Sequence, residues 1–144
     1  LKLILIGYGP EYEKIKYFIK KLKIKEKVII LKRTKNPYPY IKKSNLLVLS
    51  SKYEGMGNVL VEAITLNTPV ISSNCNAGPS EILSNGKGGD LFKVSNFKDL
   101  SKKIIIHFKN ENLLKKKLQF AKKKLFRFDI KKNAKIYSNI FEQI

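Results

Sequence analysis

Several residue types are scarce in this chain of 144 residues, and each scarcity excludes a class of protein. A single cysteine, Cys75, excludes an internal disulfide framework and suits a reducing compartment. Apolar runs are short: the longest, such as residues 46–49, have the length of a strand, far below the ~20 residues of a membrane-spanning helix. Arginine is limited to Arg33 and Arg127, and tryptophan is absent.

Lysine, by contrast, is abundant. Lys and Arg total 30 against 11 Asp and Glu, which gives a net charge of +19. Such a charge attracts either nucleic acid or anionic lipid, unless lysine simply fills exposed positions. Proteins that read bases usually rely on arginine, whose fork pairs with guanine. We therefore expect no specific nucleic-acid partner, and we expect weak peripheral contact with an anionic membrane, where each surface lysine contributes about 1 kcal/mol.

The length fits one domain, residues 1–144, and the hydrophobic content of 43% is that of a globular protein. No signal peptide precedes the first apolar run, so we expect a cytoplasmic protein, peripheral at most on the inner membrane face. Leu1 begins directly in an apolar segment and is not Met. We interpret the chain as the N-terminally truncated part of a longer protein, either because the natural gene is split or because the chain was cut from a longer one.

Apolar runs with strand length alternate with segments of helical periodicity. We predict strands at 1–6, 28–31, 46–49, 69–72 and 90–94. We predict helices at 11–23, 40–43, 59–66 and 79–83, and a helical region with breaks from 96 to 144. This alternation predicts an α/β fold, a Rossmann-like parallel sheet flanked by helices. Ligands bind such sheets at the carboxyl ends of the strands, so the loops at Gly7, Lys32, Ser50 and Ser73 should share one rim.

A glycine-rich loop precedes the helix that we predict near Asn58. The amides of its first turn, at Val59 and Leu60, lack intrahelical acceptors and carry the positive end of the helix dipole. Gly55 and Gly57 have no side chains and let a ligand approach the backbone. The segment therefore predicts an anion site that suits a diphosphate.

Two carboxylates flank this anion site. Glu54 lies in the loop, and Glu62 lies one turn inside the helix. Carboxylates accept hydrogen bonds from hydroxyl groups, so the pair suits a nucleotide diphosphate-sugar, with ribose on one side and the sugar on the other. Alternatively, Glu62 is a solvated helix residue and Glu54 an ordinary loop acid.

The two glutamates, separated by seven residues, resemble the E-x7-E motif of the retaining GT-B glycosyltransferases of family 4, group 1. Five further segments resemble that family in the family's order, over roughly residues 1–95. They are residues 5–10 (LIGYGP), 36–46 (beginning NPYPY), 50–55 (SSKYEG), 69–73 (PVISS) and 78–83 (GPSEIL). The chain departs from the family at Met56-Gly57, where Phe-Pro is common, and at Asp90, where an apolar residue is usual.

The resemblance implies a role for each matching residue. Glu62 would bind the ribose hydroxyls, and Glu54, the catalytic-site carboxylate, would contact the hydroxyls of the donor sugar. Arg33 and Thr34 would contact the base. The remaining donor-binding residues form the glycine-rich loop and the helix start: Gly55, Met56, Gly57, Asn58, Val59 and Leu60.

The resemblance also implies the reaction. A hexose or N-acetylhexosamine would pass with retained configuration from a nucleotide-sugar, by family habit a UDP-sugar, to a glycan or lipid-linked acceptor, as in lipopolysaccharide biosynthesis. No bound metal or other cofactor would be needed. The acceptor domain would precede this chain, so we expect donor binding without turnover from the chain alone.

Three alternatives stay open at the level of sequence. Glu54 and Glu62 could meet the spacing of roughly 5–9.5 Å between glycosidase carboxylates. The chain could be a non-catalytic nucleotide-sugar-binding remnant. A basic nucleic-acid-binding domain is the third hypothesis.

The apolar positions of residues 130–141 predict a helix whose apolar face either covers another domain or docks on its own domain.

Overall fold

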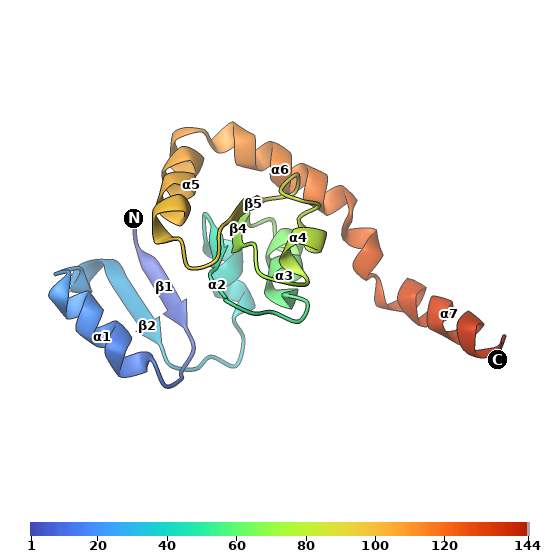
Figure 1. The fold of residues 1–144 in the computed structure, drawn as a ribbon, viewed down its shortest axis with the longest axis horizontal. Helices are drawn as coiled ribbons and strands as arrows, with labels where there is room; N and C mark the ends of the chain where they lie inside the picture. Colours follow the sequence, from blue (N-terminus) through green and yellow to red (C-terminus); the bar gives the residue numbers. More distant parts are fainter. Residues whose placement is uncertain (144) are drawn as a thin grey trace. The chain divides into compact units, whose positions relative to one another are not determined.

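Short strands and helices alternate along the chain in a computed structural model, which describes residues 1–143 (Figure 1). The strands are β1 (Leu3–Ile6), β2 (Val28–Leu31), β3 (Leu47–Leu49), β4 (Val70–Ser73) and β5 (Asp90–Phe92). The helices are α1 (Tyr12–Lys21), α2 (Tyr38–Lys43), α3 (Asn58–Thr65), α4 (Pro79–Ile82), α5 (Phe97–Lys109), α6 (Glu111–Lys123) and α7 (Ile130–Phe141). Single 3-10 turns occupy Lys25–Lys27 and Leu125–Phe128.

The chain divides into two compact units, Leu1–Pro39 and Tyr40–Ile144. In the first unit, β1 and β2 form a parallel ladder with Leu3 opposite Val28 and Ile6 opposite Leu31. Helix α1 connects the two strands. No residue between 1 and 39 is fully buried, and Leu3 remains 49% exposed although it lies in a strand. This unit therefore has almost no core of its own.

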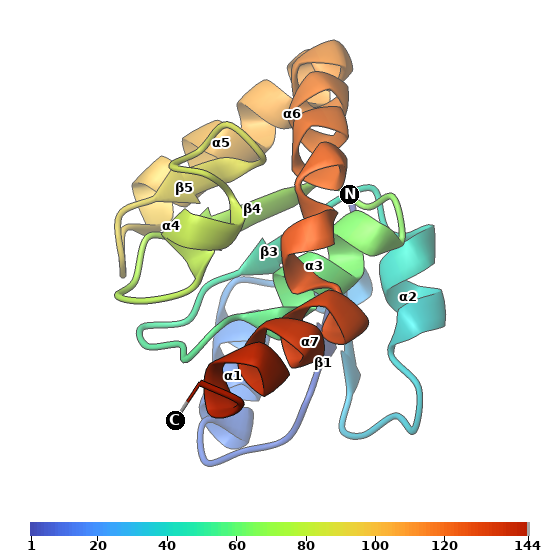
Figure 2. The ribbon, with the colours of Figure 1, turned by 90° about the vertical axis from the view of Figure 1, so that its right-hand side faces the viewer.

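The second unit contains a parallel sheet in the order β3-β4-β5. All four residues of the central strand β4 are buried, because α3 and α5 lie on opposite sides of the sheet (Figures 1 and 2). Helix α3 packs on β3 and β4, and α5 packs on β4 and β5. The buried core comes from α2, α3, β4, α4 and α6: Ile41, Leu60, Ala63, Ile64, Val70, Ile82, Leu83 and Ala121.

The two last helices differ in their packing. Helix α6 packs against α3 and α5 and buries Leu114 and Ala121. Helix α7 projects away from the rest of the second unit and buries none of its residues, so Ile130 and Phe141 are 82% and 73% exposed (Figure 1). Among residues 1–143, no helix combines the length and the apolarity needed to cross a bilayer.

The predicted fold class is confirmed: parallel strands alternate with helices that flank them. The bounds of the strands and of the first four helices agree with the sequence prediction within two residues; for example, β5 ends at Phe92 and not at Val94. The hydrogen bonds form two ladders, whereas the alternation of elements predicts one sheet. Within each unit the strand ends adjoin, as the Gly7 amide donating to the Leu31 carbonyl at 2.9 Å shows for β1 and β2.

Candidate functional site

The loop after β3 enters α3 through Gly57. This glycine has φ 80° and ψ 44°, in the left-handed region that glycine adopts without strain and that proline cannot reach. It is buried, and a Cβ added to it would lie 3.6–3.8 Å from side chains of Leu49, Leu60 and Pro79. These are ordinary van der Waals distances, so the positive φ, and not a lack of space, favours glycine at position 57, where the chain turns into the helix.

The first turn of α3 has no side-chain cap. The amides of Asn58 and Val59 donate to no acceptor in the part of the chain that the structure describes. The Leu60 amide, which we expected to be free, donates to the Gly57 carbonyl at 2.9 Å, and the Leu60 side chain is fully buried. The expectation for Leu60 is thus corrected, because the helix closes its first turn on Gly57. Asn58 and Val59 retain donors that an anion could accept.

Both predicted carboxylates are half-buried. Within residues 1–143, neither Glu54 nor Glu62 has a hydrogen bond or an ion pair from its side chain. Glu62 follows Asn58 by four residues, which places the two on one side of α3, away from the buried side chains of Leu60 and Ala63. The carboxylate of Glu62 is therefore available to a ligand that contacts the first turn.

Two contacts hold the glycine-rich loop, one from the end of β4 and one from the loop that follows it, and neither was predicted from the sequence. Ser73, which is buried, donates from Oγ to the carbonyl of Ser51 at 2.6 Å. Gly78 has φ 76° and ψ −75°, and a Cβ on it would overlap the carbonyl group of Met56. Glycine at 78 therefore permits the loop that carries Gly55 and Met56 to lie against the next loop. In the sequence, the glycine that directly precedes Pro79 is the feature that points to this close approach of the two loops.

Arg33 and Thr34 belong to the first unit. Arg33 is exposed, and the Thr34 hydroxyl donates to the Asn36 carbonyl at 3.1 Å. The Asn36 side chain in turn accepts from the Tyr38 amide at 3.0 Å. These bonds build the turn after β2, so Thr34 has a local structural role. Contact of either residue with a base stays a prediction.

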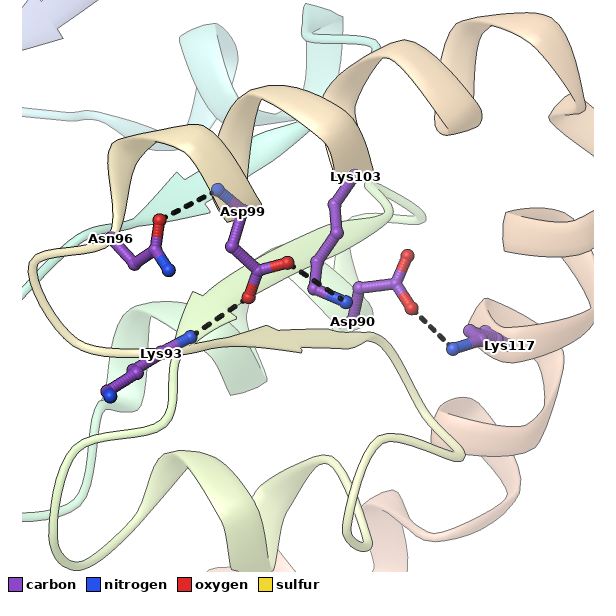
Figure 3. Close-up of polar contacts among 6 residues, drawn as sticks. All are labelled: Asp90, Lys93, Asn96, Asp99, Lys103 and Lys117. Carbon is purple, nitrogen blue, oxygen red and sulfur yellow. Dashed lines mark hydrogen bonds and ion pairs between the residues drawn. The ribbon is translucent and has the colours of Figure 1, made fainter.

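Asp90 is explained by a lysine from α6. Lys117 donates to Asp90 Oδ1 at 2.5 Å (Figure 3). It also donates to the Gly86 carbonyl at 3.0 Å. The two side chains are only 23% and 15% exposed. Asp90, which departs from the family pattern, thus forms a mostly buried ion pair with Lys117, and this pair connects α6 to β5.

One of the two arginines is also accounted for by the fold. The guanidinium of Arg127 donates to the carbonyls of Glu81 and Ile82 at 3.3–3.4 Å, at the carboxyl end of α4. Arg127 thereby satisfies acceptors that a helix end leaves open. It holds the helix that follows the loop of Gly78.

Comparison with known proteins decides the family. Residues 1–124 match the family described as glycosyl transferases group 1. The chain belongs to the group 1 glycosyltransferases. The matched residues include the whole first unit and most of the second, so the resemblance found in the E-x7-E segment and its neighbours is confirmed at the level of the family.

Related glycosyltransferases are much longer than this chain. This chain is 45% identical over 82 residues to the uncharacterized glycosyltransferase MJ1059 of Methanocaldococcus jannaschii. The aligned residues are 57% of this chain and 20% of that protein. The chain is 29% identical over 135 residues to a Campylobacter jejuni N-acetylgalactosamine-N,N'-diacetylbacillosaminyl-diphospho-undecaprenol 4-alpha-N-acetylgalactosaminyltransferase, over 94% of the chain and 37% of that enzyme. The chain thus spans well under half of the length of these relatives.

A solved glycosyltransferase shares the fold. The crystal structure of a mutant of TarM from S. aureus, in complex with fondaparinux, alpha-GlcNAc-glycerol and UDP, superposes with a TM-score of 0.88 at 25% identity. The match covers 98% of this chain and 29% of that protein. The arrangement of strands and helices described above is therefore that of part of a GT-B glycosyltransferase.

Proposed function

We propose that this chain is the donor-binding part of a retaining glycosyltransferase, and that it binds a UDP-sugar at the start of α3. The observation that carries the proposal is the first turn of α3 after Gly57, which has no side-chain cap. The amides of Asn58 and Val59 have no acceptor among the described residues, and one turn further the Glu62 carboxylate has no partner there either. UDP bound to TarM and the sugar transfer named for the Campylobacter enzyme support a nucleotide-sugar as the ligand.

Each group has a role in this proposal. The amides of Asn58 and Val59 hold the diphosphate and stabilise the charge that develops on it as the sugar leaves. Glu62 accepts hydrogen bonds from the ribose hydroxyls, and Glu54 accepts them from the donor sugar. Gly55 and Met56 form the loop beside the sugar.

The base and the metal complete the proposal for the donor. Arg33 and Thr34 contact the base. Helix amides and basic side chains stabilise the leaving diphosphate in place of a metal, so the transfer needs no bound metal.

The complete enzyme requires a second domain. We propose that an N-terminal acceptor domain joins this chain and supplies the hydroxyl of a glycan or a lipid-linked acceptor. A hexose or N-acetylhexosamine is then transferred with retained configuration. The chain alone binds the donor without turnover. The protein acts in the cytoplasm, in peripheral contact with the anionic inner membrane face.

Calorimetry of the 144-residue chain with UDP, GDP and a UDP-N-acetylhexosamine tests the donor site. We expect UDP and the UDP-sugar to bind. Glu62→Ala should weaken UDP binding about tenfold or more, because a hydrogen bond to a charged group contributes about 1.5–3 kcal/mol. It should leave the thermal unfolding temperature nearly unchanged, since Glu62 has no partner among the described residues.

Glu26→Ala is the matched control. Glu26 is an exposed carboxylate of the first unit, so its removal changes the net charge equally and should not change UDP affinity. If both variants lose UDP affinity equally, the change in net charge alone explains the effect of Glu62→Ala. A chain that binds no nucleotide would overturn the donor-site proposal.

A further inference from the structure

A groove of about 670 Å³ lies between α1 and β2, within the first unit. Its floor is apolar and half-buried, and is formed by Ile19 of the helix and by Val28 and Ile30 of the strand. None of the residues that line it belongs to the glycine-rich loop or to α3. It is therefore separate from the residues that we assign to the donor.

The rim of the groove is basic. Lys16, Lys20 and Lys23 recur at intervals of four and three residues along α1, which places them on one side of the helix. Lys25 follows in the 3-10 turn, and all four lysines are exposed. Among the described side chains, one acid, Glu13, lines the same groove, and it pairs with Lys16 at 3.2 Å. Four ammonium groups against one carboxylate leave the rim strongly positive.

Aromatic side chains complete the chemistry of the groove. Tyr12 and Tyr17 line it, and Tyr17 is 60% exposed. Lysine carries a long apolar stem below its charge, and tyrosine carries an apolar ring below its hydroxyl, so both place their apolar parts in a hydrocarbon boundary and their polar ends in water. Helices that lie in the interface of anionic membranes combine the same residues.

We propose that the groove between α1 and β2, with its rim of Lys16, Lys20, Lys23 and Lys25, docks the chain on an anionic phospholipid bilayer. The proposal gives the membrane contact proposed above a defined surface, and it does not depend on nucleotide binding. Lipid phosphates pair with the lysines, and Tyr17 enters the headgroup layer beside the apolar floor.

The composition of the groove favours lipid over the other polyanions and over a second copy of the chain. Binding of a nucleic-acid backbone requires cations but no apolar floor, and no arginine lines this groove. A second copy would bring an equally basic surface to the rim, and each chain already carries a net charge of +19. An anionic bilayer is complementary both to the rim and to the floor.

Vesicle flotation with the full chain tests this surface. The chain should float with vesicles of phosphatidylglycerol and phosphatidylcholine and not with phosphatidylcholine alone, and the binding should weaken with salt. The combined Lys16→Gln, Lys20→Gln and Lys23→Gln variant should partition about a hundredfold less into the anionic vesicles. Equal binding to both vesicle types, or no binding, would overturn the proposal.

Two controls separate this groove from a general cationic attraction. The combined Lys102→Gln, Lys109→Gln and Lys116→Gln variant removes the same charge from exposed positions of α5 and α6, and should lose less than about threefold. Tyr17→Ser should lose about tenfold without any change in charge. If the two lysine variants lose equally, or if Tyr17→Ser binds as the parent chain does, the groove is not the docking surface.

Further measurements keep the outcomes distinct. A labelled DNA duplex that displaces the chain from vesicles, and that loses affinity in the Lys16, Lys20 and Lys23 variant but not in Tyr17→Ser, would make the surface a polyanion site and contradict the lipid assignment. UDP calorimetry on the same variants should give the parent affinity. That result keeps a failed membrane proposal distinguishable from a failed donor site.

Discussion

Gly57 and Gly78 show how the shape of the candidate site depends on the backbone of two residues. Gly57 occupies the left-handed region, and Gly78 has both a positive φ and no room for a Cβ beside Met56. A side chain at either position has to distort the loop between β3 and α3. The carboxylates that bind the donor in our proposal are thus positioned by residues that offer no chemistry of their own.

Gly78→Ala should lower both stability and donor binding. The added methyl group overlaps the Met56 carbonyl, and the positive φ adds strain, for a loss of about 1–3 kcal/mol in the free energy of unfolding. Thermal unfolding and UDP calorimetry on the variant provide the two readouts. Gly55→Ala is the control for stability, since a Cβ there meets nothing within 4 Å and its φ is not positive. Unfolding of Gly78→Ala at the parent temperature would contradict the close packing of the two loops.

The ion pair of Asp90 with Lys117 leads to a second prediction at the scale of residues. Lys117→Met should destabilise the chain by about 2–4 kcal/mol, because it leaves a mostly buried carboxylate without its charged partner. Chemical denaturation measures this loss. The double variant Asp90→Leu, Lys117→Met should recover most of the stability, since an apolar pair replaces an ion pair at little cost. If the double variant is as unstable as Lys117→Met, the loss of stability does not come from leaving the Asp90 carboxylate unpaired.

Helix starts in this chain are of two kinds. Asn96, Asn110 and Asp129 cap α5, α6 and α7, and each side chain accepts a hydrogen bond from the amide three residues later. Helix α3 begins at Gly57 with no such cap. The caps satisfy amides that would otherwise need water, whereas the amides of Asn58 and Val59 in α3 have no acceptor among the described residues. The contrast marks α3 among the longer helices of the second unit.

Removal of one cap should cost the stability of one helix. Asn96→Ala should lower the free energy of unfolding by about 1 kcal/mol, because the Asp99 amide loses its acceptor at 3.0 Å (Figure 3). Circular dichroism during urea unfolding gives the value. Asn139→Ala, at an exposed position inside α7, should be neutral or slightly stabilising, since alanine has the higher helix propensity. Equal effects of the two substitutions would contradict a capping role.

The two units differ in how much of their surface they bury. Every residue of β4 in the second unit is buried, whereas no residue from 1 to 39 is. Local opening costs little where few apolar contacts hold an element. The first unit should therefore open locally at a low cost in free energy, while the sheet β3-β4-β5 has its own core.

Hydrogen exchange should reveal this difference in the whole chain. We expect the amides of β4 to exchange slowest, in global unfolding events, and those of α1 and β1 to exchange orders of magnitude faster through local opening. Mass spectrometry of peptides from each segment measures both rates in one sample. Comparable protection of α1 and β4 would show that the first unit is as stable as the second.

The identity and order of the strands and helices could be predicted because each leaves a local pattern. The apolar run before Gly7 is such a pattern, and the alternation of such runs with helical segments predicted the correct fold class. The family was predicted from the resemblance of the E-x7-E segment and five further segments, and not from a local pattern. The contacts of Ser73 with Ser51 and of Lys117 with Asp90 could not be predicted, since their partners lie 22 and 27 residues apart. Periodicity carries no information on such distant pairs.

The α/β class could be predicted from the spacing of apolar residues along the chain, the family from the resemblance of several short segments, and the chemical groups of the candidate site from the residue types. Which of those groups remain free depends on the three-dimensional fold. In the fold, the Leu60 amide donates to the Gly57 carbonyl, and the amides of Asn58 and Val59 have no acceptor among the described residues. Gly78 lies directly against the backbone of Met56. The reason is physical: a hydrogen bond or a close approach depends on where two backbones meet in space, and that position is set by packing.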